Sequence, residues 1–194
     1  MAIVKLNKEG YGQIELNQVA FRRDGRIEAQ CALNSEEFPV GKTEIGSVAE
    51  NGMLFAIDNV KHELKKATLA LAASEVIGIN YSTEHLYDER MGGSYKYFYL
   101  PNGDTFFPRL GLLAIGDKFH TNTICYDNEK YANEDAIKTA VNGVAPVYAG
   151  IASDGSGYWE ISATAPTAGP VARVIEFATM PDGQTGLKLQ ILRV

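Results

Sequence analysis

The sequence has few histidines and cysteines, and neither residue type is clustered. The three histidines, His62, His85 and His120, are isolated from one another, and Cys31 and Cys125 lie 94 residues apart. Zinc and redox sites usually show local pairs such as CxxC or HxxxH, and neither spacing occurs here. The sequence therefore predicts no metal site, no cofactor, and two free thiols that are buried as small hydrophobic side chains.

Sequence motifs of catalytic loops are also missing. There is no GxSxG, no GxGxxG and no P-loop, and the Gly-rich run 153–157 is typical of a hairpin turn. His120, three residues after Asp117, is the best candidate for a proton carrier, but we expect a partly exposed strand histidine there. We therefore predict no catalytic residues and no enzymatic activity. A hydrolase of unrecognised type remains an alternative, which would require that substitution of His120 abolish turnover.

Basic clusters and long apolar runs are absent as well. The net charge is −6, and the only adjacent basic pairs that stand out are Arg22–Arg23 and Lys65–Lys66. Nucleic-acid binding needs a clustered basic face, so we expect no nucleic-acid partner. The longest apolar stretch, 67–79, falls well short of the roughly 20 residues of a membrane span, and the first residues do not resemble a signal peptide. We expect a chain that folds in a cytoplasm and has no membrane partner.

Turn signals dominate what is present. Six Asx-Gly pairs punctuate the chain: Asp24-Gly25, Asn51-Gly52, Asn102-Gly103, Asn142-Gly143, Asp154-Gly155 and Asp182-Gly183. Such pairs suit the positive φ angles of tight hairpin turns. Short segments between them alternate in polarity, for example 77–81, 174–177 and 187–191. The sequence predicts a mainly β fold, an antiparallel barrel or sandwich with one short helix, built either as one unit or as two small β subdomains.

The predicted helix follows Asn133. This residue can cap it, two acidic residues favour its first turn, and Ile137 and Val141 share one face before Asn142-Gly143 ends it. For Lys61–Ala73 the pattern allows a strand or a helix. The run Ala163–Pro170, rich in Pro, Ala and Gly, predicts a loop between strands.

Composition divides the chain into three sections. Residues 1–45 are polar and weakly patterned, which indicates an N-terminal arm or subdomain. Residues 46–131 hold most of the aromatic residues and predict an aromatic-rich β domain. Residues 132–194 predict a C-terminal β domain that opens with the short helix.

The aromatic block is the most informative feature for function. Tyr95, Tyr97 and Tyr99 alternate along one predicted strand, which places three tyrosines on a single side. Tyrosine is enriched at interfaces because it joins a large apolar ring to a polar end. The same residues also fit the margin of a small β core, or a platform that stacks on sugar rings. The candidate protein interface comprises Tyr87, Tyr95, Tyr97, Tyr99, Phe107 and Arg109.

One longer stretch carries a resemblance to a known group of proteins. The sequence FFPRLGLLAIGDKFHTNTICY at 106–126 resembles virion structural proteins of tailed bacteriophages, and 86–90 and the closing pattern of 159–161 with 181–184 are similar in kind. The likeness covers about residues 45–194 and includes no catalytic motif. It implies a head-associated protein of the capsid decoration, or cement, type.

The resemblance implies the partners and the location. These are the major capsid protein and neighbouring copies of the same chain, with a trimer favoured among homo-oligomers, and the location is the capsid of the virion. An acidic protein with a polar and aromatic contact face agrees with this role. The alternatives are a carbohydrate-binding or host-attachment module on the virion, and a tail or connector protein.

Overall fold

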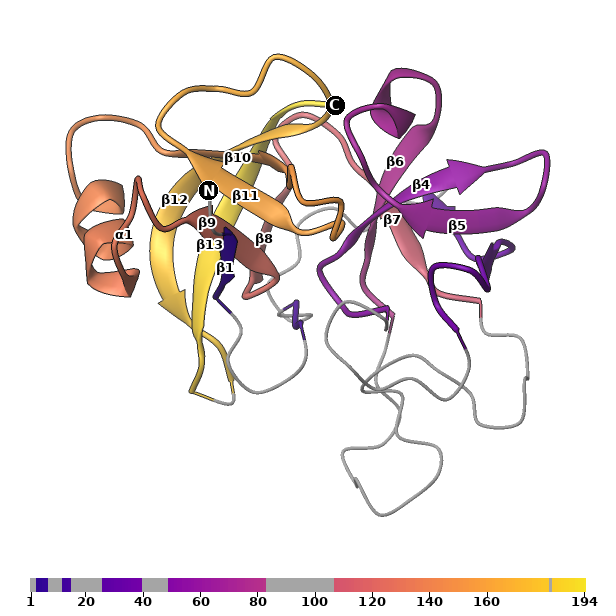
Figure 1. The fold of residues 1–194 in the computed structure, drawn as a ribbon, viewed down its shortest axis with the longest axis horizontal. Helices are drawn as coiled ribbons and strands as arrows, with labels where there is room; N and C mark the ends of the chain where they lie inside the picture. The colour runs from indigo at the N-terminus through magenta and orange to yellow at the C-terminus, as the bar shows by residue number, and fades with distance from the viewer. Residues whose placement is uncertain (1–2, 7–11, 15–25, 40–48, 83–106, 182) are drawn as a thin grey trace.

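In the computed structural model, two β-sheets lie side by side (Figure 1). The described residues are 3–6, 12–14, 26–39, 49–82, 107–181 and 183–194. The seven-stranded sheet has the order β1 (Ile3–Lys5), β9 (Ile124–Asp127), β11 (Trp159–Ser162), β10 (Tyr148–Ile151), β12 (Val171–Thr179), β13 (Thr185–Arg193), β8 (Lys118–Thr121). The six-stranded sheet has the order β2 (Ile27–Glu28), β7 (Leu110–Leu112), β6 (Val76–Asn80), β4 (Leu54–Asp58), β5 (Glu63–Lys66), β3 (Ala32–Leu33). The prediction of a mainly β fold with one short helix is confirmed.

Most neighbouring strands pair antiparallel, as the turn pattern predicts. Two pairs are parallel, β9 with β11 and β3 with β5. Both sheets are therefore mixed, and the expectation of purely antiparallel pairing is wrong in this respect. Parallel neighbours need a long connection between them. Here β10 and the helix α1 (Glu134–Val141) lie between β9 and β11 in the chain, and β4 lies between β3 and β5.

The change of sheet along the chain does not coincide with the predicted section boundaries at 45 and 131. The chain leaves the six-stranded sheet after β7 and returns to the seven-stranded sheet with β8, between residues 112 and 118. Strand β1, from the predicted N-terminal section, pairs with β9 in the seven-stranded sheet. Turn signals mark where strands end but do not specify the sheet that each strand joins.

The two sheets share a hydrophobic core. Leu54 and Ile79 of the six-stranded sheet belong to the same buried cluster as Phe119 and Trp159 of the seven-stranded sheet, and all four are fully buried. The ring centroids of Phe119 and Trp159 lie 5.8 Å apart. A shared core of this kind ties the two sheets together by burial of apolar surface.

Side-chain alternation along β13 follows the predicted pattern, whereas β12 departs from it. Leu187, Leu189 and Ile191 are fully buried. In β12 the register shifts between Val174 and Glu176, which indicates a β-bulge. Val174 is buried and Ile175 is 40% exposed, and the predicted alternation is interrupted at the bulge. A bulge inserts one residue and reverses the side to which the following residues point.

Three of the Asx-Gly pairs can be compared fully with the structure. Asp154-Gly155 lies in the turn between β10 and β11, and Gly155 has φ of +74°. Asn51-Gly52 forms a turn just before β4, with φ of +86° at Gly52, and Asn142-Gly143 follows α1. Gly183, with φ of +87°, lies in the turn between β12 and β13. Asp24-Gly25, Asn102-Gly103 and residue 182 lie outside the described residues.

Helix α1 forms where the capping signal predicts it. The side chain of Asn133 accepts a hydrogen bond from the backbone N–H of Ala136 at 2.9 Å, and Ile137 is fully buried.

The segment Lys61–Ala73, for which the sequence allowed a strand or a helix, contains both: the strand β5 and the short 3-10 helix η2 (Leu71–Ala73). Among the described residues, no helix is long and apolar enough to cross a membrane.

The cap of α1 gives a first testable prediction. Asn133→Ala removes the acceptor for the Ala136 N–H, so we expect the free energy of unfolding to fall by about 1 kcal/mol. Asn142→Ala is the matched control, because Asn142 at the other end of α1 caps it through its backbone N–H. Urea unfolding followed by circular dichroism measures both. Equal losses in the two variants would contradict the capping role.

Candidate protein-binding groove

The structure describes two of the six residues predicted for the interface. Tyr87, Tyr95, Tyr97 and Tyr99 lie outside the described residues, so the tyrosine face stays a prediction. Phe107 is 50% exposed and Arg109 is exposed, whereas Pro108 and Leu110 are buried. The extended segment before β7 therefore points Phe107 and Arg109 outward.

Arg109 is fixed through its backbone. Its N–H donates to Ser82 Oγ at 2.8 Å, and its carbonyl accepts the N–H of Tyr81 at 3.0 Å. Ser82 Oγ in turn donates to Asn80 Oδ1 at 2.7 Å, and Asn80 Nδ2 donates to the Glu50 carbonyl at 2.9 Å. This buried polar network holds the outward-facing residues at one end of β7.

A groove of about 350 Å³ lies between the two sheets, away from that segment. The six-stranded sheet and η2 supply one wall, with Ala72, Val76, Ile77 and Leu112. The other wall comes from Gly169, Pro170, Arg193 and Val194, beside β12 and at the end of β13. The volume is at the lower end of the range for ligand pockets, and most of its lining is apolar.

Two arginines carry fixed positive charge at the groove. Arg26 donates from Nε and Nη2 to the carbonyls of Leu112 and Leu113, at 3.2 and 2.6 Å. Arg193 donates from Nη2 to the carbonyls of Pro166 and Gly169, at 2.8 and 3.2 Å. These bonds hold both guanidinium groups in place without neutralising their charge. Glu75 also lines the groove.

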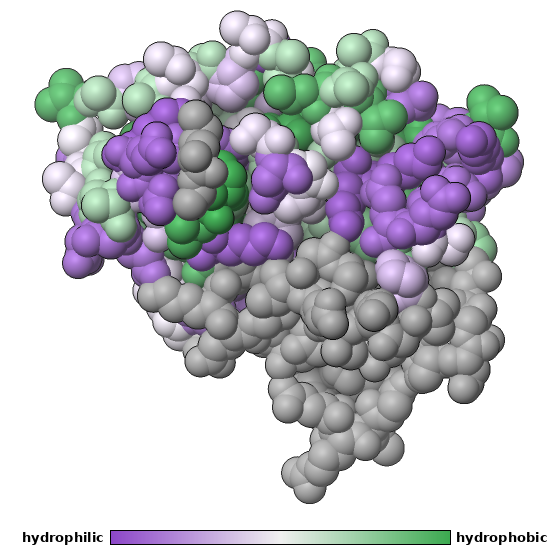
Figure 2. Space-filling model, in the orientation of Figure 1, coloured by the Kyte–Doolittle hydropathy of each residue, from purple (hydrophilic) through white to green (hydrophobic). Residues whose placement is uncertain are grey.

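Exposed apolar side chains surround the groove. Val76 and Val194, which line it, are 50% and 61% exposed. Figure 2 shows apolar residues along the upper margin of the molecule, over the region where the C-terminus and β6 lie in Figure 1. An apolar patch around a groove with a few polar groups is typical of a protein-binding surface.

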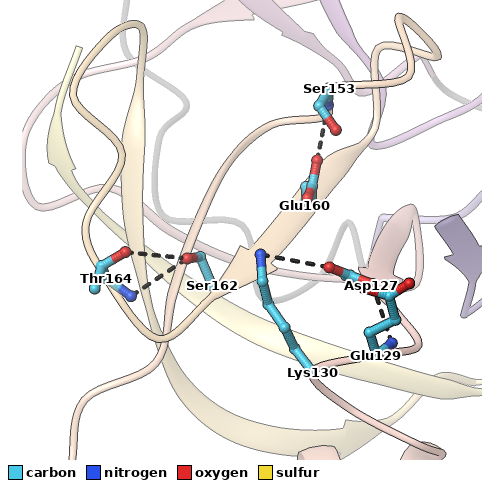
Figure 3. A network of polar contacts seen from close by, with 7 residues as sticks. All are labelled: Asp127, Glu129, Lys130, Ser153, Glu160, Ser162 and Thr164. Carbon is cyan, nitrogen blue, oxygen red and sulfur yellow. Dashed lines mark hydrogen bonds and ion pairs between the residues drawn. The ribbon is translucent and has the colours of Figure 1, made fainter. Parts of the chain in front are cut away.

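The polar residues of β11 and its neighbours form a different kind of surface (Figure 3). Their side chains interact with residues close to them in the chain. Glu160 accepts the N–H of Ser153, and Ser162 bonds to Thr164. Asp127 accepts the N–H of Glu129 and forms an ion pair with Lys130. Much of their hydrogen-bonding capacity is used in shaping local turns. We therefore regard the groove as the better candidate site.

The sequence contained only part of the signal for the groove. Ala163–Pro170 is a loop between β11 and β12, as predicted, but nothing in its composition indicates that Gly169 and Pro170 form a wall. Arg26 and Arg193 are 167 positions apart in the sequence and come together only through the fold. The exposure of Val76 in β6 is seen only in the structure, because alternation alone does not identify which strand residues face solvent.

The histidine that we considered as a proton carrier is buried. His120 in β8 is 8% exposed, so the expectation of a partly exposed strand histidine is wrong. Asp117 is fully buried, and its carboxylate accepts the N–H of Ala114 at 2.7 Å in the turn before β8. Strand β8 is an edge strand of the seven-stranded sheet, and its pairing with the long strand β13 places His120 opposite Lys188.

Both thiols are free and buried, as predicted. Burial raises the pKa of Cys31 and, more strongly, of Cys125, with nearby acidic side chains acting in the same direction. A raised thiol pKa lowers the thiolate fraction and with it the reactivity. Within the part of the chain that the structure describes, no group of three or more His, Cys, Asp or Glu side chains is placed to hold a metal ion.

The stretch 106–126, on which the expected likeness to phage virion proteins rests, occupies a defined place in this fold. Its described part runs from Phe107 through β7, β8 and β9, and so carries the chain from one sheet to the other. Comparison with known protein families, with curated proteins and with solved structures found no match to this chain.

Proposed function

We propose that this protein is a virion structural protein of a tailed bacteriophage, a capsid decoration protein that binds the exterior of the major capsid lattice and stabilises it. The observation that carries the proposal is the apolar groove between the two sheets, with Val76 and Val194 exposed in its walls. A protein that adds to a preformed shell must expose its contact surface before it binds. The resemblance at 106–126 supports the choice of a phage shell as the partner.

The groove fits a short segment of the capsid protein with apolar side chains and an acidic group. The apolar walls would bury the side chains, and the charges of Arg26 and Arg193 would orient the acidic group. A groove of about 350 Å³ holds only a few side chains, so one contact is weak. Many copies on a symmetric lattice, associated as trimers, would add modest contacts to a stable whole.

The proposal predicts that the purified protein binds the shells of the phage that encodes it and raises their melting temperature. Val76→Lys places a charged side chain in the groove wall, and we expect at least a tenfold loss of affinity for shells, about 1.4 kcal/mol. Val144→Lys is the control, because Val144 is fully exposed beyond α1 and does not line the groove. Sedimentation of protein with shells measures both. Equal binding of the two variants would show that the groove is not part of the interface.

A second candidate is a carbohydrate-binding or host-attachment module of the virion. It rests on the tyrosines at 95, 97 and 99, whose rings would stack on sugars if the sequence pattern holds. Binding of the purified protein to cell-wall glycan, without binding to shells, would favour this function. Cryo-electron microscopy of the intact virion separates a head position from a tail or connector position.

A further inference from the structure

The two sheets are joined along a short seam, residues 50–54, which leads into β4. Three hydrogen bonds link the seam to residues just before β9 and β11 of the seven-stranded sheet. Leu54 N–H donates to the Gly157 carbonyl at 2.7 Å, Thr123 Oγ1 donates to the Asn51 carbonyl at 2.6 Å, and the Tyr158 hydroxyl donates to the Glu50 carboxyl. A few consecutive residues therefore carry much of the polar contact between the sheets.

Glu50 is the unusual member of the seam. Its side chain is fully buried, as is that of Tyr158, which precedes β11. Carboxyl groups are almost never fully buried unless they are paired, because removing the charged form from water is unfavourable. Met53 Sδ accepts the backbone N–H of Glu50, and Asn80 donates to its carbonyl, so the backbone of Glu50 is also held in place.

Groups from four parts of the fold influence the pKa of the Glu50 carboxyl. Burial raises its pKa to about 7 and is the largest effect. The Tyr158 hydroxyl, Lys5 at the end of β1, the backbone N–H of Gly12 and Lys66 at the end of β5 lower the pKa and so oppose burial, in this order. The carboxyl therefore changes its charge near neutral pH.

The two lysines are held close to this site by aromatic rings. Lys5 Nζ lies 4.1 Å from the centroid of the Tyr158 ring, and Lys66 Nζ lies 5.0 Å from that of Phe38. Burial, as the largest effect, lowers the pKa of Lys66. Both ammonium groups favour an ionised Glu50, but neither removes the cost of its burial.

We propose that the buried Glu50 carboxyl is a pH-sensitive latch between the two sheets, with the seam closed when Glu50 is protonated and loosened when it ionises. A neutral carboxyl group fits the closed seam, whereas the ionised group gains solvation when residues 50–54 separate from Tyr158. The latch is a property of the isolated chain and does not depend on what the groove binds.

The direction of the pH effect follows from the raised pKa. The folded protein binds the Glu50 proton more tightly than the unfolded chain does. The resulting stabilisation is complete below the unfolded pKa of 4.5 and is lost as the pH rises through the folded pKa of about 7. Between pH 5 and pH 8 this one group should increase the unfolding equilibrium constant on the order of 50-fold.

The test compares Glu50→Gln with the unsubstituted protein from pH 5 to pH 8. Glutamine keeps the shape and an acceptor for Tyr158 but has no charge to gain, so the 50-fold change attributable to Glu50 should disappear. Glu36→Gln, at an exposed carboxylate, is the control and should keep the full pH dependence. Urea unfolding followed by fluorescence of Trp159, the only tryptophan and the neighbour of Tyr158, measures all three. The same pH dependence in Glu50→Gln and the unsubstituted protein would overturn the proposal.

Amide hydrogen exchange distinguishes a local latch from a change in overall stability. After correction for the intrinsic pH dependence of exchange, we expect the Leu54 amide to lose protection between pH 5 and pH 8 more than the Leu189 amide in β13 does. Equal loss at both amides would show global destabilisation and overturn the latch. Tyr158→Phe should move the transition to higher pH, because the hydroxyl favours the ionised form, and an unmoved transition would contradict its part in the latch.

Discussion

Replacing Trp159 by alanine is expected to lower the free energy of unfolding by about 3–5 kcal/mol. Trp159 is fully buried in the core that the two sheets share, where its ring packs against Phe119. It also begins β11, the strand between β9 and β10. Removing the indole leaves a cavity that the surrounding strands cannot close without giving up their register.

Trp159→Phe is the matched control for this prediction. Phenylalanine keeps an aromatic ring in the core and removes an indole N–H that has no acceptor among the described residues. We therefore expect a markedly smaller loss than for alanine. Urea unfolding followed by circular dichroism measures both variants, since each lacks the single tryptophan. Similar losses for alanine and phenylalanine would show that the core does not depend on the volume of the ring.

Gly52→Ala is expected to have the second largest effect, a loss of about 3 kcal/mol. Gly52 has φ of +86°, a conformation that side chains other than glycine rarely adopt. A methyl group there would also lie 2.6 Å from Thr123 Oγ1 and would collide with Thr121 Oγ1. Thr123 uses its hydroxyl to bond the Asn51 carbonyl, so the substitution would disturb the seam.

Gly116→Ala separates the two causes. Gly116 has φ of +93°, but a methyl group there would meet no atom within 4 Å. We expect this control to lose only the conformational part, about 1–2 kcal/mol. Thermal or urea unfolding of both variants measures the difference. A loss in Gly52→Ala no greater than that in Gly116→Ala would show that crowding at the seam contributes nothing.

The local features of the fold could be predicted because their causes lie within a few residues. Asn133 caps α1 through a bond to a backbone group three residues later. The alternation at 187–191 and the turns at Asp154-Gly155 and Gly183 likewise follow from neighbouring residues. Short-range patterns of this kind specify where strands and helices begin and end.

Other features depend on partners far away in the chain. The bulge in β12 arises from its pairing with β13 and exposes Ile175, which the period of two alone placed with Phe177. His120 is buried although β8 is an edge strand, whose partner β13 comes some 70 positions later in the sequence. A single sequence gives no register between distant strands, so their facing residues cannot be assigned from it.

The candidate site shows the same division. Phe107 and Arg109, which the sequence predicts at an interface, face outward but do not line the groove. The groove itself could not be predicted, since Arg26, Val76 and Arg193 come from three distant segments. Glu50 gave no sign of burial either, because its surroundings come from β1, β5 and the start of β11.

The sequence by itself determined that this protein has no clustered histidines or cysteines, that it is mainly β, and where its helix and several of its turns lie, because residue type and spacing act over short distances. Only the tertiary structure decided which sheet each strand joins, that Glu50 is buried at the seam, and that an apolar groove opens between the sheets. Burial and electrostatics depend on which distant segments come into contact, and strand pairing across the whole chain sets those contacts.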